Sequence, residues 1–199
     1  MKRALIIFVR HPEKGKVKTR LAASIGEEKA FSVYIELLEH THAISALVHA
    51  DKFVFYANKI QREDMWETPE FTKKLQTNDD LGGKMRSAFS VIFEMGYQQV
   101  IIIGSDCFEL STAMIELAFA SLEVKEVVIG PANDGGYYLL GMKKLLPFIF
   151  EKKQWSTNNV FQQTINDLQR EKISYSELAI LTDVDTEEDW VKTKKQIPN

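Results

Sequence analysis

Short, uninterrupted apolar runs alternate along the chain with longer segments in which apolar residues recur at helical spacing. The runs at 4–9 and 100–103 are rich in β-branched residues and end at polar or flexible positions. Such runs are typical of strands buried on both faces of a parallel sheet. The other predicted strands lie at 52–57, 126–130 and 137–142, with weaker ones at 74–77 and 178–181.

Between these strands, apolar residues recur every three or four positions, which predicts helices. In the segment 84–95, Met85, Phe89 and Ile92 share one face, and Gly96 ends the helix. The remaining helices are predicted at 27–50, 111–122 and 161–171 and from Thr186 onward, with a short one at 63–66. Because strands and helices alternate, we expect a single α/β domain over residues 1–199, a three-layer α/β/α sandwich with a mostly parallel sheet.

Composition narrows the class of function. A hydrophobic content of 45% suits a globular domain, and a formal net charge of -3 argues against a protein that binds nucleic acid by neutralising its phosphates. No run reaches the ~18 apolar residues of a membrane span, and the apolar segment after Met1 has no cleavage site behind it. A cytoplasmic protein is therefore expected. The single cysteine, Cys107, allows no intrachain disulfide and agrees with a reducing compartment.

The loop predicted after the first strand is strongly basic. Its Lys and Arg residues are Arg10, Lys14, Lys16, Lys18 and Arg20. Basic side chains beside the start of a helix favour a site for phosphate. The alternative is a solvated loop that keeps the surface soluble, since the loop has neither a Walker-type nor a dinucleotide-binding glycine motif.

Carboxylates follow two of the predicted strands. Asp106 lies just beyond the central strand, and Asp183 and Asp185 follow the last one. Open α/β sheets bind ligands at the carboxyl ends of their strands, so these residues could together hold a hard cation such as Mg²⁺. The structural alternative is a role at a helix N-terminus, although Ser111 could cap the helix after Asp106 without help.

Two further features carry candidate chemistry. The loop Asp134, Gly135, Gly136 and Tyr137 lets a ligand approach the backbone closely and offers a carboxylate to a sugar hydroxyl, but a plain Asp-Gly hairpin has the same sequence. Cys107 could be a nucleophile. A buried cysteine beside the ligand turn is the favoured interpretation, because the sequence places no histidine to activate it.

Five segments, in order, resemble one family. They are VKTRL at 17–21, LGGKM at 81–85, GSDC at 104–107, GPANDGGYYLLG at 130–141 and DVDT at 183–186. They resemble the bacterial radical-SAM/selenodomain-associated transferases, a DUF2064-like branch of the nucleotide-diphospho-sugar transferase superfamily. The resemblance covers about residues 4–192 and implies a GT-A fold, a Rossmann-like mixed sheet with one reversed strand. One departure is Phe108, which stands where the family usually has proline after the cysteine.

The resemblance implies how a nucleotide would bind. It places the nucleotide phosphates on Lys18 and Arg20, with Arg10 and Lys14 beside them. It assigns Leu81 and Gly82 to the base pocket.

It also implies a metal centre. Asp106 would bind Mg²⁺ or Mn²⁺ together with Asp185, with Asp183 as the second choice. Asp106, Lys18 and Asp134 are then the expected catalytic residues, and the 134–137 loop binds the sugar or the acceptor.

The expected function is a metal-dependent transferase that binds a nucleotide or nucleotide-sugar donor and a small-molecule acceptor. Glycosyl transfer is favoured because the phosphate loop is poor in glycine, unlike the nucleotidyltransferase fingerprint. Nucleotidyl transfer from an NTP, with release of pyrophosphate, is the alternative. A nucleotide-binding module without catalysis is a third possibility, and no oligomeric state is predicted.

Overall fold

The computed structural model describes residues 1–196. The strands are β1 (Arg3–Val9), β2 (Asp51–Tyr56), β3 (Phe71–Leu75), β4 (Gln99–Ile103), β5 (Val127–Pro131), β6 (Tyr137–Met142) and β7 (Tyr175–Glu177). The helices are α1 (Thr19–Ile25), α2 (Glu27–Ala46), α3 (Leu81–Glu94), α4 (Thr112–Val124), α5 (Val160–Arg170), α6 (Glu187–Gln196) and the 3₁₀ helix η1 (Pro147–Phe150).

The strands form one sheet in the order β3-β2-β1-β4-β6-β5-β7. Only β6 runs against its neighbours: it is antiparallel to β4 and β5, whereas the other pairs are parallel. The predicted mixed, mostly parallel sheet with one reversed strand is therefore confirmed. The apolar runs form β1 and β4, which pair at the centre of the sheet.

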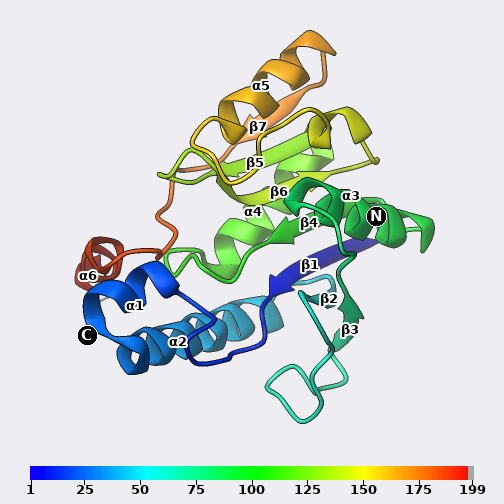
Figure 1. Ribbon diagram of the computed structural model, residues 1–199. Helices are drawn as coiled ribbons and strands as arrows, with labels where there is room; N and C mark the ends of the chain where they lie inside the picture. The colour runs from blue at the N-terminus through cyan, green and yellow to red at the C-terminus, as the bar shows by residue number, and fades with distance from the viewer. Residues whose placement is uncertain (197–199) are drawn as a thin grey trace.

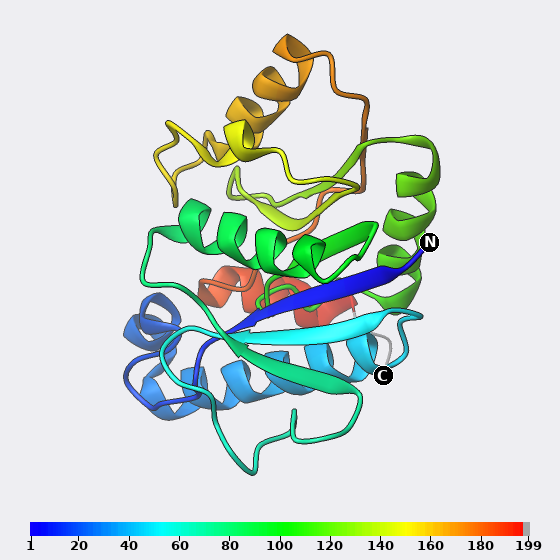
Figure 2. The same ribbon diagram turned by 90° about the vertical axis from the view of Figure 1, so that its right-hand side faces the viewer.

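Helices cover both faces of the sheet, as the two views in Figures 1 and 2 show. Alternate residues of β1 point to opposite faces, so Leu5 and Ile7 join the core beneath α2 and α4, and Ala4 and Ile6 join the core beneath α3 and α5. Because both cores are apolar, the central strands need the continuous hydrophobic runs seen in the sequence.

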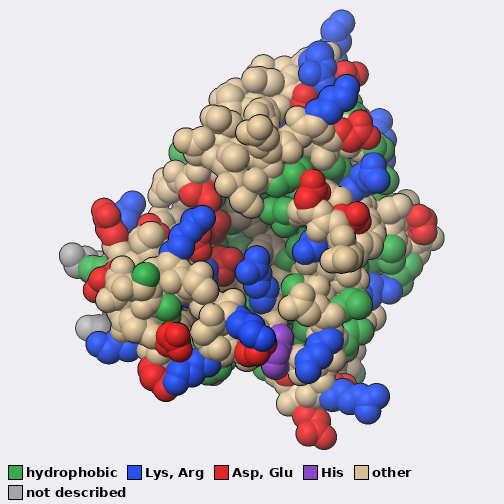
Figure 3. Space-filling model, in the orientation of Figure 1, with side chains coloured by type: hydrophobic (Ala, Val, Ile, Leu, Met, Phe, Trp, Pro, Cys, Tyr) green, Lys and Arg blue, Asp and Glu red, His purple; other side chains and the backbone are tan. Residues whose placement is uncertain are grey.

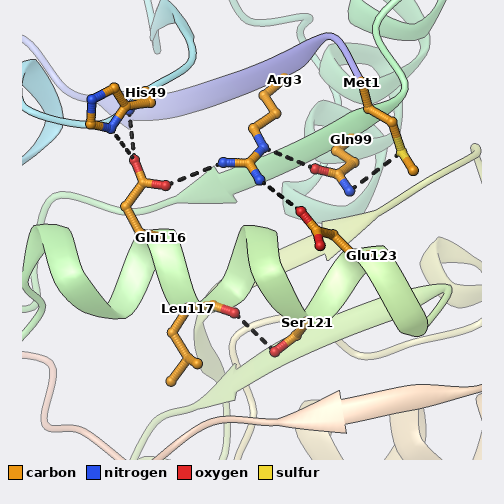
Figure 4. Close-up of polar contacts among 8 residues, drawn as sticks. All are labelled: Met1, Arg3, His49, Gln99, Glu116, Leu117, Ser121 and Glu123. Atoms are coloured by element: carbon orange, nitrogen blue, oxygen red, sulfur yellow. Dashed lines mark hydrogen bonds and ion pairs between the residues drawn. The ribbon is translucent and has the colours of Figure 1, made fainter.

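A network of hydrogen bonds and ion pairs lies at the amino end of the central strands (Figure 4). The Arg3 guanidinium donates to Gln99 Oε1 at 3.2 Å and pairs with Glu116 at 3.3 Å and Glu123 at 3.2 Å. Glu116 also accepts from the backbone N–H of His49 at 2.7 Å. The network connects α4 to the first residues of β1 and β4. It lies at the end of the sheet opposite the carboxyl ends of these strands.

Several predicted elements were wrong at their boundaries. The helix predicted at 27–50 ends at Ala46, because the chain must turn back into β2. The segments at 74–77 and 178–181 were placed too late, since the strands are Phe71–Leu75 and Tyr175–Glu177. The short helix predicted at 63–66 is a turn, held by the side chain of Asp64 through the backbone N–H of Trp66 at 3.1 Å.

Three helical segments were missed: α1, the first turn of α3 and the 3₁₀ helix η1. Helix α1 had no prediction: its first two residues were assigned to the basic loop and the rest to the segment between that loop and the helix predicted from residue 27. The structure shows that α1 packs Leu21 against α2. The predicted loop 79–83 is in part helical, because Asp80 caps α3 by accepting from the backbone N–H of Gly83 at 2.8 Å. The 3₁₀ turn Pro147–Phe150 had no prediction.

Candidate functional site

A cavity of about 800 Å³ opens at the carboxyl ends of β1 and β4. Its lining includes the start of the basic loop, the turn after β4, the loop before β6 and the segment after β7. Figure 3 shows this side of the molecule hollowed near its middle, with acidic and basic side chains gathered around the hollow. The position agrees with the general rule that open α/β sheets bind ligands beyond the carboxyl ends of their strands.

Lys18 connects the two carboxylates proposed as metal ligands. Its Nζ lies 2.6 Å from Asp106 Oδ1 and 3.3 Å from Asp185 Oδ1. Only 5% of the Lys18 side chain is exposed. Burial lowers the pKa of this ammonium, but its ion pairs with Asp106 and Asp185 outweigh burial and hold the pKa above its ordinary value. Lys18 is therefore a charged group held inside the cavity wall.

The backbone brings the two carboxylates together. The Val184 N–H donates to the carbonyl oxygen of Asp106 at 2.9 Å, so the segment after β7 lies against the turn after β4. An isolated parallel bridge between Ala132 and Leu181 guides this segment along the end of the sheet. Asp106 and Asp185 thus meet although 79 positions separate them in the sequence, as 185 minus 106 gives.

The helix-capping alternatives are taken by other residues. Ser111 caps α4 by accepting from the backbone N–H of Met114 at 3.3 Å. At α6, Asp189 Oδ2 accepts from the Thr186 N–H at 2.8 Å, and Thr186 Oγ1 accepts from the Asp189 N–H at 3.3 Å. This reciprocal pair is a capping box. Neither Asp106 nor Asp185 is needed as a cap, so both carboxylates are available to the cavity.

Asp183 lies beside this pair and differs from it in charge. Burial, helped by the negative charges of Asp106 and Asp134, raises the pKa of Asp183 to about 8. At neutral pH its carboxyl group is therefore mostly protonated, and it can donate a hydrogen bond. Asp183 lines the cavity with Asp106 and Asp185 but is a different kind of group from these two ion-paired carboxylates.

The basic loop divides into two sets. Arg10, Lys18 and Arg20 line the cavity, and Arg20 Nη1 lies 3.5 Å from Asp185 Oδ2. Lys14 does not line the cavity and pairs with Glu28. The neighbouring lysine, Lys16, pairs with Glu13 at 2.6 Å and is 71% exposed, so this part of the loop fits the description of a solvated surface.

In the 134–137 loop, Asp134, Gly136 and Tyr137 line the cavity, whereas Gly135 lies behind it. Asp134 Oδ1 accepts from the Gly136 N–H at 2.8 Å, as in an ordinary tight turn. The turn leaves the second carboxylate oxygen of Asp134 for a ligand. The Tyr137 hydroxyl is buried and has no hydrogen-bond partner among the described residues.

Leu81 lines the cavity, and Gly82 does not. Sequence reasoning missed two aromatic side chains of the wall. Tyr34 on α2 donates to the Arg10 carbonyl at 3.0 Å and accepts from the Arg10 N–H at 3.1 Å, which fixes the start of the basic loop. Burial and the charge of Asp106 raise the pKa of Tyr34 to about 12. The other missed side chain is that of Trp155. Tyr34 was missed because its position in the sequence looks like that of any core residue of a helix, and Trp155 because its segment has no periodic pattern.

Cys107 is buried, as the favoured interpretation expected. Burial is the main cause that raises the pKa of its thiol far above the ordinary range. The thiol is therefore protonated at neutral pH, and a protonated thiol is a poor nucleophile.

A divalent cation fits the donor set of the cavity. Oxygens of Asp106 and Asp185 already converge on one cation, the Lys18 ammonium. Mg²⁺ is commonly held by one or two carboxylates and completed by water and substrate phosphates. Within residues 1–196, no group of three or more His, Cys, Asp or Glu side chains is arranged to hold a metal ion.

The arrangement of the sheet is that of the nucleotide-diphospho-sugar transferase fold. The chain belongs to the family described as "Uncharacterized protein conserved in bacteria (DUF2064)", whose sequence profile matches residues 40–157. A comparison with curated proteins gave no match.

Three solved structures illustrate the relationship. A protein from Desulfovibrio desulfuricans G20, provisionally named a nucleotide-diphospho-sugar transferase, is 32% identical over 94% of this chain and 84% of its own, with a TM-score of 0.85. Two others share the fold alone. One is the manganese complex of Rv0371C from Mycobacterium tuberculosis H37Rv, which is 10% identical over 99% of this chain and 100% of its own, with a TM-score of 0.61. The other is 4-diphosphocytidyl-2C-methyl-D-erythritolsynthase from Anaerococcus prevotii DSM 20548, which is 11% identical over 98% of this chain and 95% of its own, with a TM-score of 0.62.

None of the helices among residues 1–196 has the length and apolar character needed to cross a membrane.

Proposed function

We propose that this protein is a transferase that binds a nucleotide-diphospho-sugar and moves the sugar to a small-molecule acceptor. The observation that carries the proposal is the position of Lys18 between Asp106 and Asp185, at the wall of a cavity of about 800 Å³. The 32% identity with the Desulfovibrio protein supports the nucleotide-sugar donor.

Each group has a role in this scheme. Asp106 and Asp185 would hold Mg²⁺ or Mn²⁺, which when bound supplies positive charge to the departing nucleoside diphosphate. The manganese complex among the structures of the same fold supports this choice of metal. Lys18 and Arg20 bind the diphosphate, and Arg10 lies on the same wall of the cavity. Asp134, which also lines the cavity, positions the acceptor or the sugar.

Transfer of the sugar depends mainly on the alignment of donor and acceptor and on positive charge near the leaving diphosphate. The bond between sugar C1 and the diphosphate oxygen breaks, and the electron pair leaves with the diphosphate. An acceptor hydroxyl oxygen forms the new bond at C1, and its proton is released to water. Fixed positive groups that face the leaving diphosphate stabilise the charge that develops there, so no covalent protein intermediate is required.

The test is a thermal-shift panel of NDP-sugars, NDPs and NTPs, each with Mg²⁺, Mn²⁺ or EDTA. A ligand at about 100 times its dissociation constant stabilises a protein by about 2.7 kcal/mol, roughly 5–10 °C for a chain of this size. We expect a metal-dependent shift from one NDP-sugar. A shift from one NTP alone, followed by release of pyrophosphate with a phosphorylated acceptor, would instead establish nucleotidyl transfer.

Asp106→Asn separates an enzyme from a binding module. We expect it to abolish the metal-dependent part of the shift and turnover with the NDP-sugar found in the panel. The matched control is Glu13→Gln, which removes a carboxylate from the solvated part of the basic loop. Equal behaviour of Asp106→Asn and wild type in every assay would contradict a metal-dependent transferase.

A further inference from the structure

The Lys18 ammonium occupies the position between the two carboxylates where a divalent cation is proposed to bind. Its contacts of 2.6 Å to Asp106 Oδ1 and 3.3 Å to Asp185 Oδ1 mean that a metal ion bound to the same two oxygens would lie next to the ammonium. In the ligand-free protein, Lys18 therefore pairs with the same two carboxylates that a metal ion would need.

Lys18 also has an unusual backbone conformation. Its φ of 47° and ψ of 44° are left-handed, a conformation that is unfavourable for a residue with a Cβ. Residues persist in such conformations when the surrounding structure determines them, and they concentrate at functional sites. Because Lys18 is also almost fully buried, its ammonium needs a negative partner at every stage of the binding cycle.

The charges of the cluster set the order of events. Lys18 and Arg20 balance the charges of Asp106 and Asp185 in the ligand-free protein. A divalent cation added to this neutral set would face an ammonium group within a few ångströms, which is repulsive in a poorly solvated cavity wall. A nucleoside diphosphate brings the negative charge that gives the ammonium a new partner and frees both carboxylates.

We propose that Lys18 is an internal competitor of the metal ion and so couples the binding of metal to the binding of the nucleoside diphosphate. In the ligand-free protein the ammonium holds Asp106 and Asp185 and keeps the affinity for metal low. When a diphosphate binds, Lys18 turns to its oxygens and the metal takes the carboxylates. This inference rests on the proposed function, because it assumes that metal and diphosphate share the cavity.

Mn²⁺ alone tests the competition, with free Mn²⁺ measured by its EPR signal. We expect Lys18→Met to bind Mn²⁺ about tenfold more tightly than wild type or better, within the usual range of coupling between two sites. Lys16→Met is the matched control, since it removes a lysine of the same loop that pairs only with Glu13, and it should bind as wild type does. Asp106→Asn should lose Mn²⁺ binding.

Thermal shifts test the coupling. With UDP, CDP, GDP and ADP in turn, the stabilisation of wild type by Mn²⁺ and diphosphate together should exceed the sum of their separate effects, and Lys18→Met should lose this excess. Equal or weaker Mn²⁺ affinity in Lys18→Met, with binding still abolished by Asp106→Asn, would overturn the competition and leave the proposed function standing. Failure of every variant and of wild type to bind Mn²⁺, with or without a diphosphate, would overturn both.

Discussion

Gly82 lies directly against the indole ring of Trp155: a Cβ built on Gly82 would be 2.2 Å from Trp155 Nε1. Gly82 is in the first turn of α3, and Trp155 belongs to the segment after η1. Trp155 also meets Tyr137 edge to face, with ring centroids 6.5 Å apart. The shape of this wall of the cavity thus depends on the absence of a side chain at Gly82, which contacts the lining residue Trp155 without lining the cavity itself.

Gly82→Ala should displace Trp155. The overpacking costs about 1–3 kcal/mol, more than the up to ~1 kcal/mol that alanine gains over glycine in a helix. We expect an altered Trp155 emission, which Trp155→Phe assigns, together with weaker ligand shifts in the thermal panel. Gly104→Ala is the control for the emission alone, since a Cβ there meets nothing within 4 Å but Gly104 lines the cavity. Unchanged emission in Gly82→Ala would show that the wall adapts without moving the ring.

Gly135 is also closely packed, in its case against backbone. It has φ +86°, and a Cβ there would lie 2.0 Å from the backbone oxygen of Asn158. Gly26 has φ +88° and ψ 154°, a backbone region that essentially only glycine adopts, and nothing lies within 4 Å of a Cβ there, so Gly26→Ala carries backbone strain alone. We expect about 1–3 kcal/mol of destabilisation in Gly26→Ala and a larger loss in Gly135→Ala, because the latter adds a clash with the Asn158 backbone. Urea unfolding of both variants gives the comparison, and equal losses would mean that the Asn158 backbone moves aside freely.

Much of the fold could be predicted because its signal is local. Strands β1 and β4 are buried on both faces and therefore need apolar runs. Helix α3 is buried on one face and therefore has apolar residues on that face alone. Short elements were misplaced because they lack such a pattern. Strand β7 has three half-buried or exposed residues, and it is a strand only because β5 offers a free edge.

The site was harder to predict than the fold. The family resemblance and strand-end positions grouped Asp106 with Asp185, and the structure places them together. The lysine between them could not be foreseen, because its placement depends on a left-handed backbone conformation at Lys18. Nor could Trp155, whose contact with Gly82 joins segments that are more than 70 residues apart, 155 minus 82 being 73.

Cys107 provides a test of the cavity wall that needs no ligand. Its thiol is buried, and its pKa is raised by burial, so it should resist DTNB in the native protein and react at once in urea. Cys107→Ser should keep the metal-dependent ligand shift and lose the urea-dependent labelling. Rapid labelling of the native protein would show that the thiol is reachable and would reopen a role as a nucleophile.

Asp183 should make the protein less stable as the pH rises. Its folded pKa of about 8 lies above the ordinary value of 3.8, so between these values the folded state holds a proton that the unfolded state has released. Stability from this group is therefore complete below about pH 4 and is lost as the pH passes through 8. In EDTA, the free energy of unfolding of wild type should fall relative to Asp183→Asn by about 1 kcal/mol for each pH unit between pH 5 and 7. Glu94→Gln, at an exposed position on α3, is the control and should follow wild type. Parallel curves for wild type and Asp183→Asn would show that Asp183 is ionised in the folded protein and joins Asp106 and Asp185 as a third negative charge.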